Sequence, residues 1–165
     1  MTDALQRLWA PWRHQYVSRA TRHAVGCIFC RAHRSRNDRK TQVVCRGRRA
    51  FVLLNRYPYN PGHLMVAPCR HLGRLERLSA DEGQELFQLT QRMTHALTTL
   101  LHPHGMNVGM NLGRAAGAGI PGHLHLHIVP RWAGDTNFMP IIGRTKVLSS
   151  SLTELYRNLK ALVDA

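Results

Sequence analysis

Residues 123–132, with the sequence HLHLHIVPRW, alternate three histidines with aliphatic side chains. Because a β-strand turns every second side chain to the same face, this period predicts a strand with His123, His125 and His127 on one face. The aliphatic residues between them then point into a core. Each imidazole carries two ring nitrogens that need partners, and it titrates near neutral pH. Three imidazoles on one face favour metal binding or nucleophilic chemistry at phosphorus, with a polar strand face as the plainer alternative.

The length of 165 residues predicts a single domain that is large enough to bury a core without disulfides. No apolar run is long enough to span a bilayer, and residues 1–13 lack the apolar segment of a signal peptide. We therefore expect a cytoplasmic protein with reduced thiols and no membrane partner.

The charge of the chain is strongly positive, since 23 Lys and Arg oppose 9 Asp and Glu for a formal net charge of +14. Such a field attracts anions, either a polyphosphate nucleotide or a nucleic acid. A solvated, arginine-rich surface is the plainer interpretation, and the charge alone favours it. Nucleic-acid surfaces usually interleave aromatic side chains with basic ones, and residues 31–49 contain no Phe, Tyr or Trp. A nucleotide is therefore the favoured partner and a nucleic acid the less favoured one.

Short apolar segments around one long helix predict an α+β fold with a five-stranded antiparallel sheet. The strands are expected at 41–46, 50–55, 63–67, 105–112 and across the triad segment. Ser79 and Glu82 match a capping box that begins the long helix. A second helix over 151–163 is expected to bury one face, formed by Leu152, Leu155, Leu159 and Leu162.

The single domain (1–165) is expected to comprise an N-terminal arm over 1–40, a catalytic core over 41–148 and a C-terminal helix over 149–165. Much of the arm, residues 18–40, is polar and basic and is expected to be loop. It carries the pair Cys27-x-x-Cys30, and this spacing is half of a zinc site. Reduced structural thiols are the alternative, and a redox-active pair is less favoured.

A glycine-rich loop over 113–122 leads directly into the triad. A loop with so few side chains lets backbone N–H groups approach a phosphate, although such loops are often plain turns. Asn111 comes at the end of the strand before this loop. Asn55 and His63 flank a turn over 57–62 and could lie at the same end of the sheet. The triad and the loop together indicate an anion site.

The chain resembles the histidine triad (HIT) superfamily of nucleotide hydrolases and nucleotidyltransferases. Residues 123–129 match its motif His-φ-His-φ-His-φ-φ, in which φ is apolar. Residues 54–68 and 107–113 are also similar to this family, as are residues 8–13 and 135–138. Within the superfamily the chain looks closest to the bacterial diadenosine tetraphosphate phosphorylases. A related activity, transfer of AMP from adenylyl sulfate to phosphate, looks similar in sequence.

The resemblance implies a two-step displacement at the α-phosphorus. The middle histidine, His125, would be the nucleophile and would form a nucleotidyl-imidazole, with its other ring nitrogen held by a backbone carbonyl. His127 and His63 would hydrogen-bond to the phosphate and the bridging oxygen, and His123 would complete the catalytic set. Water or inorganic phosphate would then release the nucleotide.

The resemblance also implies the substrate contacts. Asn55 would contact the ribose and Asn111 the phosphate. The backbone amides around Gly117, Gly119 and Gly122 would stabilise charge on the phosphate oxygens. Many family members carry Gln or Ser at the position of Gly119, and its absence here slightly favours a phosphorylase or transferase over a simple hydrolase.

Some HIT relatives bind zinc through a histidine that matches His71, together with the first triad histidine. By that resemblance, the zinc ligands here would be Cys27, Cys30, His71 and His123. No organic cofactor is expected. HIT proteins are usually homodimers with a continuous ten-stranded sheet, so a homodimer is expected too. Two other functions remain open, namely removal of adenylate from nucleic-acid ends and pure metal binding by all three histidines.

Overall fold

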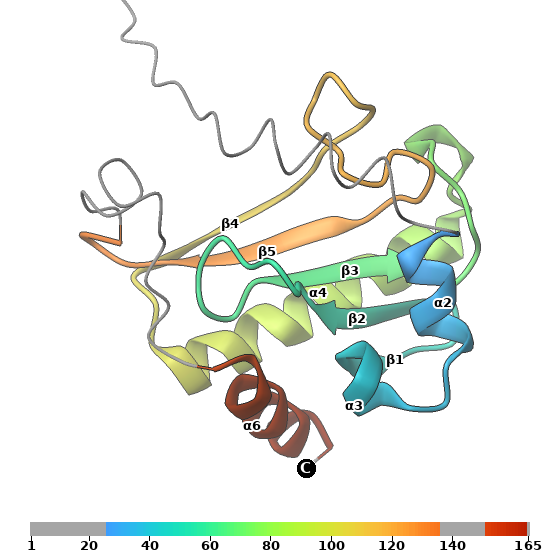
Figure 1. The fold of residues 1–165 in the computed structure, drawn as a ribbon. Helices are drawn as coiled ribbons and strands as arrows, with labels where there is room; N and C mark the ends of the chain where they lie inside the picture. The colour runs from blue at the N-terminus through green and yellow to red at the C-terminus, as the bar shows by residue number, and fades with distance from the viewer. Residues whose placement is uncertain (1–25, 136–150, 165) are drawn as a thin grey trace, which may run out of the picture.

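The sheet of the computed structural model runs in the order β1-β2-β3-β5-β4, and every neighbouring pair is antiparallel (Figure 1). The structure describes residues 26–135 and 151–164. Its strands are β1 (Val43–Arg46), β2 (Ala50–Leu54), β3 (Leu64–Pro68), β4 (Gly105–Met110) and β5 (Leu126–Arg131). The predicted α+β class and five-stranded antiparallel sheet are confirmed. The similar segments 8–13 and 136–138 lie outside the described residues.

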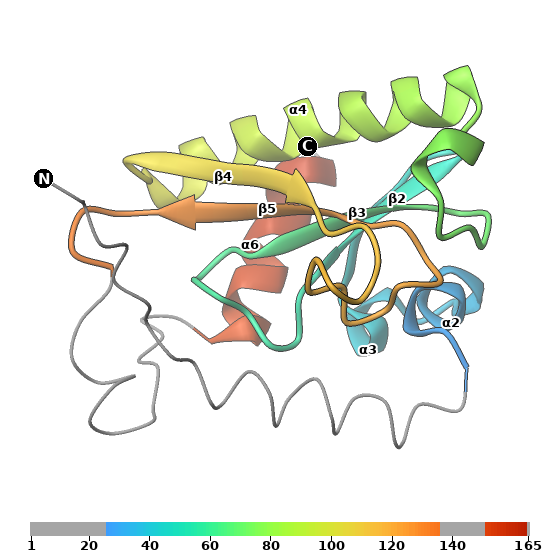
Figure 2. The same cartoon turned by 90° about the horizontal axis from the view of Figure 1, so that it is seen from above.

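The two central strands β2 and β3 are buried along their whole length because both faces of the sheet are covered. The helices α4 (Ala80–Leu101) and α6 (Leu152–Asp164) pack on one face, where Val52 and Leu54 join their apolar residues. The short helix α2 (Ile28–Arg34) packs on the other face against Phe51 and Leu53. Figure 2 shows α4 on one side of the sheet and α2 on the other.

The long helix α4 begins as predicted. The Ser79 hydroxyl accepts the Glu82 amide, and the Glu82 carboxylate accepts the Ser79 amide. In α6 the predicted apolar face is partly wrong. Leu155 and Leu159 are buried, but Leu162 is 40% exposed and Val163 is buried instead. A helical period of 3.6 residues continues the stripe from 159 to 163, since the fourth residue lies nearest the same face.

The expectation that residues 18–40 are mainly loop is wrong for the described part of that segment. It contains α2 and the one-turn helix α3 (Asp38–Thr41). The Arg46 guanidinium donates to the carbonyl oxygens of Ala32, His33 and Ser35 at 3.0, 2.8 and 2.9 Å, and to the Asp38 carboxylate. It thereby satisfies the free carbonyls at the end of α2. A contact from β1 stabilises this seven-residue helix, which no side-chain N-cap supports.

The turn between β2 and β3 is held against the far end of β5. The Asn60 amide donates to the carbonyl oxygen of Pro130 at 2.8 Å, and Gly62, in the predicted turn over 57–62, adopts φ +78°, which glycine tolerates. A short 3₁₀ turn, η1 (Leu75–Arg77), precedes α4. Over residues 26–135 and 151–164, no helix is both long and apolar enough to cross a bilayer.

Candidate active site

The triad does not lie entirely in a strand, as the alternation predicted. β5 begins at Leu126, so His123 and His125 precede it and only His127 is a strand residue. The ladder stops because β3 ends at Pro68, which has no N–H to donate. The carbonyl oxygen of Pro68 instead lies 2.9 Å from His123 Nε2, and the Leu124 amide donates to Leu72. The backbone that leads into β5 is therefore shaped by loop contacts.

His125 is held in one tautomer by the backbone. Its Nδ1 lies 2.8 Å from the carbonyl oxygen of His123. Because a carbonyl oxygen only accepts, Nδ1 carries the proton and Nε2 keeps its lone pair. The side chain is 5% exposed, and this burial lowers the pKa of His125, partly opposed by the same hydrogen bond. The ring is therefore a neutral base at neutral pH, with the atom needed for nucleophilic attack unprotonated.

His63 and His127 form a second pair. The Tyr59 amide donates to His63 Nδ1 at 3.1 Å, and the Asn55 side-chain amide lies 3.3 Å from the same atom. His63 Nδ1 is thus an acceptor, and its protonated Nε2 donates to His127 Nδ1 at 2.9 Å. This order leaves the proton of His127 on Nε2. The ring of His127 lies edge-on to that of His125, with centroids 4.9 Å apart.

Two asparagines, Asn55 and Asn111, are also predicted to contact substrate. Asn55 lies against His63, and its side-chain oxygen accepts the Tyr57 amide. Asn111 follows Met110, which pairs with Leu126, so Asn111 lies beside the segment that carries His125. The strand register thus places Asn55 beside His63, where β3 begins, and Asn111 near the start of β5, at the other end of the β3–β5 pairing.

Some backbone amides of the glycine-rich loop donate hydrogen bonds within the loop itself. The amide of Gly117 donates to the carbonyl of Arg114, and the amide of Ala118 to that of Gly113. For Gly119 and Gly122, the described chain offers no backbone acceptor. A Cβ added at Gly119 would have no neighbouring atom within 4 Å, so this position opens onto free space. The amides of Gly119 and Gly122 are therefore not engaged in the backbone turns of the loop.

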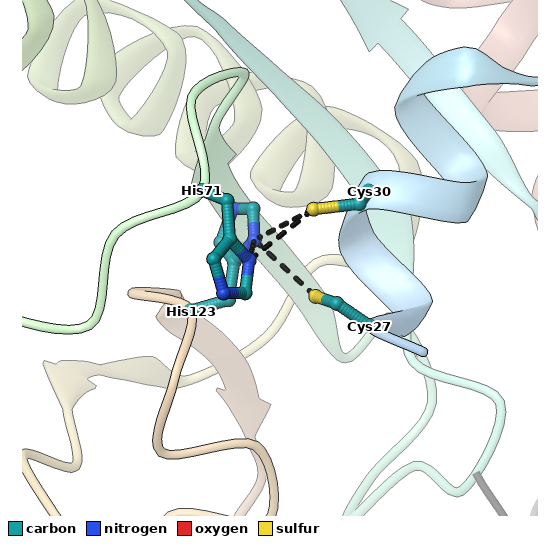
Figure 3. Close-up of side chains that lie close together, drawn as sticks. All are labelled: Cys27, Cys30, His71 and His123. Carbon is teal, nitrogen blue, oxygen red and sulfur yellow. Dashed lines mark hydrogen bonds between the residues drawn. The ribbon is translucent and has the colours of Figure 1, made fainter. Parts of the chain in front are cut away.

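Two thiols and two imidazoles, one of them the first histidine of the triad, converge so that their ligand atoms all lie within 4.8 Å of one another (Figure 3). His123 Nδ1 lies 3.3 Å from Cys27 Sγ, 3.6 Å from Cys30 Sγ and 3.2 Å from His71 Nδ1. A fourth separation, Cys30 Sγ to His71 Nδ1, is 3.3 Å. Zinc bonds of about 2.3 Å to sulfur and 2.0–2.1 Å to nitrogen separate tetrahedral ligands by roughly 3.3–3.8 Å. The four residues could hold a metal ion.

The other nitrogen of His123 explains how its ring is oriented. Nε2 donates to the carbonyl of Pro68, which leaves the Nδ1 lone pair directed at the other three ligands. Both nitrogens of His123 are thus engaged away from His125 and His127. The geometry places the His123 ring in the cluster with Cys27, Cys30 and His71, and its backbone carbonyl against Nδ1 of His125.

Sequence reasoning missed two features that support the site. Phe29, between the two cysteines, packs its ring on His123 and His125. Asp135 accepts hydrogen bonds from Asn60 and from Arg131, and the Arg131 guanidinium holds the pKa of that carboxyl well below its usual range. The four-residue spacing of Arg131 and Asp135 was a visible signal for the second feature. For Phe29, the signal was an apolar residue inside the Cys-x-x-Cys pair.

Comparison with known proteins agrees with this geometry. The HIT domain family matches residues 36–134. The AP-4-A phosphorylase of Mycobacterium tuberculosis (strain CDC 1551 / Oshkosh) is 42% identical over 164 residues, which cover 95% of this chain and 84% of that protein. A bifunctional bis(5'-adenosyl)-triphosphatase/adenylylsulfatase of Arabidopsis thaliana is 33% identical over 115 residues, 70% of this chain and 60% of that protein.

Among solved structures, a zinc-bound histidine triad family protein from Mycobacterium smegmatis superimposes with a TM-score of 0.67 at 25% identity, covering 84% of this chain and 94% of that one. The resemblance to the histidine triad proteins is therefore confirmed over the fold and over most of the sequence. The chain belongs to the HIT domain family, and it is an enzyme.

Proposed function

We propose that this enzyme cleaves the α-phosphate anhydride of diadenosine polyphosphates through an adenylyl-His125 intermediate, and that phosphate is the acceptor. The observation that carries the proposal is the buried His125 ring, whose Nδ1 is bound to a carbonyl oxygen and whose Nε2 is unprotonated. The 42% identity to a protein named AP-4-A phosphorylase supports this substrate class.

In the first step, the Nε2 lone pair of His125 forms a bond to the α-phosphorus. The bond from that phosphorus to the bridging oxygen breaks, and the electron pair stays on the departing phosphate. With diadenosine tetraphosphate, ATP leaves and AMP remains on His125. The Nε2–H of His127 is directed at the oxygen on which negative charge develops, and His63 keeps that proton on Nε2 through its own hydrogen bond. The fully buried His63 acts through His127 in this proposal.

In the second step, inorganic phosphate attacks the adenylyl phosphorus and the N–P bond breaks, which releases ADP and restores the Nε2 lone pair. Both steps crowd negative charge onto the non-bridging oxygens. The backbone amides of Gly119 and Gly122, with Asn111, would donate to these oxygens. Asn55 would contact the ribose while it holds His63. Such positioning is the main contribution a protein makes to phosphoryl transfer.

We also propose that the cluster of Cys27, Cys30, His71 and His123 binds Zn²⁺. Four protein ligands close the coordination sphere, so the ion supplies structural anchoring rather than an activated water. It would join α2 to the loop that leads into β5. A zinc-bound member of the family at 25% identity supports the assignment of the metal.

A second candidate function is transfer of AMP from adenylyl sulfate to phosphate. It uses the same adenylyl-His125 intermediate and differs only in the leaving group, which is sulfate. The name of the Arabidopsis relative, which includes an adenylylsulfatase, favours keeping this candidate.

One experiment separates the candidates. The enzyme is incubated with diadenosine tetraphosphate, diadenosine triphosphate or adenylyl sulfate, each with and without phosphate, and the products are identified by chromatography. We expect ATP and ADP from diadenosine tetraphosphate only when phosphate is present, and no product from the His125→Ala variant. AMP as the product in both conditions would identify a hydrolase, and products from His125→Ala would overturn the mechanism.

A further inference from the structure

Phe29 lies between Cys27 and Cys30 in the sequence and packs against the ring of His125. It has no exposed surface, and its ring centroid lies 4.8 Å from that of His125 and 5.0 Å from that of His123. The interplanar angles are 31° and 38°, within the tilted, offset arrangements that aromatic pairs favour. One side chain thus packs on a metal-cluster ring and on the nucleophilic ring at once.

The sequence accounts for this placement. Phe29 is the second residue of α2, and Cys27 and Cys30 flank it on the same short segment. When both thiols are directed at His123, the apolar side chain between them is directed at the sheet. There it joins a buried group on the α2 face, formed with Ala32, Val43, Phe51, Leu53, Met65 and Ala67.

The His125 ring has three constraints in the structure. The carbonyl of His123 fixes its Nδ1, the ring of His127 meets it edge-on at an interplanar angle of 73°, and Phe29 packs on it. A single hydrogen bond leaves the tilt of an imidazole free. Because Nε2 lies across the ring from that bond, a ring that pivots at Nδ1 displaces the attacking atom. Of the two ring contacts, Phe29 is the one that packs at a shallow angle, 31°, and so restricts the tilt of the His125 ring out of its plane.

We propose that Phe29 is a positioning residue for the nucleophile, and that the Cys27–Cys30 segment thereby couples the metal cluster to the geometry of His125. The inference rests on the proposed function, since it assigns His125 as the nucleophile. Phe29 is fully buried and lies behind His125, so it has no part in holding substrate.

The expected kinetic effect follows from that position. A misplacement of about 1 Å can lower a rate by about 10²-fold, and a leucine at position 29 fills part of the volume of the ring. We therefore expect Phe29→Leu to lower the rate constant for AMP transfer to His125 about 10-fold in single turnover, with KM unchanged.

Phe51 supplies a matched control. It is the same residue type, is equally buried and belongs to the same apolar group. Its ring contact is with His33, at 5.5 Å, and within the described residues it makes no ring contact with a triad histidine. Phe51→Leu should therefore lose similar stability, measured by urea unfolding, and retain the wild-type rate. Equal rates for the two variants, both folded and carrying equal zinc, would overturn the proposal.

A readout that needs no substrate comes from NMR of the metal-loaded protein. We expect the carbon-bound protons of the His125 ring to show nuclear Overhauser effects to the Phe29 ring, and to shift in Phe29→Leu but not in Phe51→Leu. The milder Phe29→Met replaces Phe29→Leu if the latter does not fold. If the wild type forms no adenylyl adduct, the proposed function fails, while absence of these Overhauser effects in the wild type refutes the Phe29 inference alone.

Discussion

His63 and His127 are joined ring to ring, with His63 Nε2 2.9 Å from His127 Nδ1, and the Tyr59 amide behind them determines the direction of the donors. The two histidines are therefore one functional unit, of which only His127 carries a donor that can face substrate.

The first prediction concerns this unit. His127→Ala should lower kcat by about 10²-fold or more, as loss of a hydrogen-bond donor or general acid does. His63→Ala should lower it about 10-fold, since it only loosens His127. Because residues that act as a unit are non-additive, the double variant should match His127→Ala alone. The measurement is kcat of the three variants under saturating substrate. If the decrease in kcat of the double variant equalled the product of the two single decreases, His63 would have a separate role.

The features that sequence predicted are those with local causes. The capping box of Ser79 and Glu82 lies within one helical turn, and the strands follow from short apolar runs between turns. The helix α2 was missed because its stability comes from Arg46, which is distant in sequence and binds the carbonyls at its end. The start of β5 was misplaced because Pro68 on another strand ends the ladder. Both errors come from tertiary contacts that override local patterns.

Motif resemblance could predict which residues form the candidate site. It could not predict the hydrogen-bond partners that distinguish one histidine from another. The alternation of His123, His125 and His127 says nothing of where each ring nitrogen is directed. In the structure, Pro68 and the cysteines engage His123, whereas the backbone engages His125 and His63 engages His127. The three triad histidines are therefore equivalent in the sequence pattern and are distinguished by their hydrogen-bond partners.

The second prediction concerns the metal cluster. Cys27→Ser should lose bound zinc and about 3 kcal/mol or more of folding free energy, because binding energy at a closed site is folding energy. Cys69→Ser is the matched control, since Cys69 is half-buried and lies outside the cluster. Zinc per chain is measured by mass spectrometry after dialysis, and stability by urea unfolding. The assignment would be contradicted if wild-type protein purified in the presence of zinc held no zinc after dialysis.

The third prediction concerns acid stability. Hydrogen bonds from Arg70 to Glu82, partly opposed by burial, lower the pKa of Glu82 to about 2. A depressed carboxyl pKa stabilises the fold above the unfolded-state value of about 4.3, and this contribution is lost as the pH falls towards 2. Glu82→Gln should therefore lose roughly 1–2 kcal/mol at pH 6, after allowance for the exposed Arg70, and little at pH 2.5.

This test compares the free energies of unfolding of wild type and Glu82→Gln at each pH. Metal loss at low pH affects both proteins alike, so the difference between them isolates the carboxylate. A difference that does not shrink on acidification would show that packing or helix capping at position 82, rather than its charge, stabilises the fold.

The fourth prediction concerns assembly. β4 lies at the end of the strand order and pairs with β5 alone within the described chain, so its outer edge presents backbone groups to a partner. Val108 on this strand is 47% exposed. We expect a homodimer in which β4 meets its copy, and Val108→Glu should convert it to a monomer. Leu162→Glu, at a 40% exposed site on α6, should not. Light scattering after size-exclusion chromatography measures the mass, and a monomeric wild type would contradict the expected dimer.

The final prediction concerns the acceptor. By the resemblance to HIT proteins, Gly119 occupies a position at which many of them carry Gln or Ser. A Cβ at this position would meet no atom within 4 Å. Gly119→Ser should therefore fold with unchanged Tm. Its hydroxyl can donate to a phosphate oxygen or hold a water near the adenylyl phosphorus, whereas the glycine leaves that space to inorganic phosphate. The variant should release a higher ratio of AMP to ADP from diadenosine tetraphosphate at fixed phosphate. Gly83→Ser, at an open position on α4, is the control, and an unchanged ratio in Gly119→Ser would show that the acceptor is selected elsewhere.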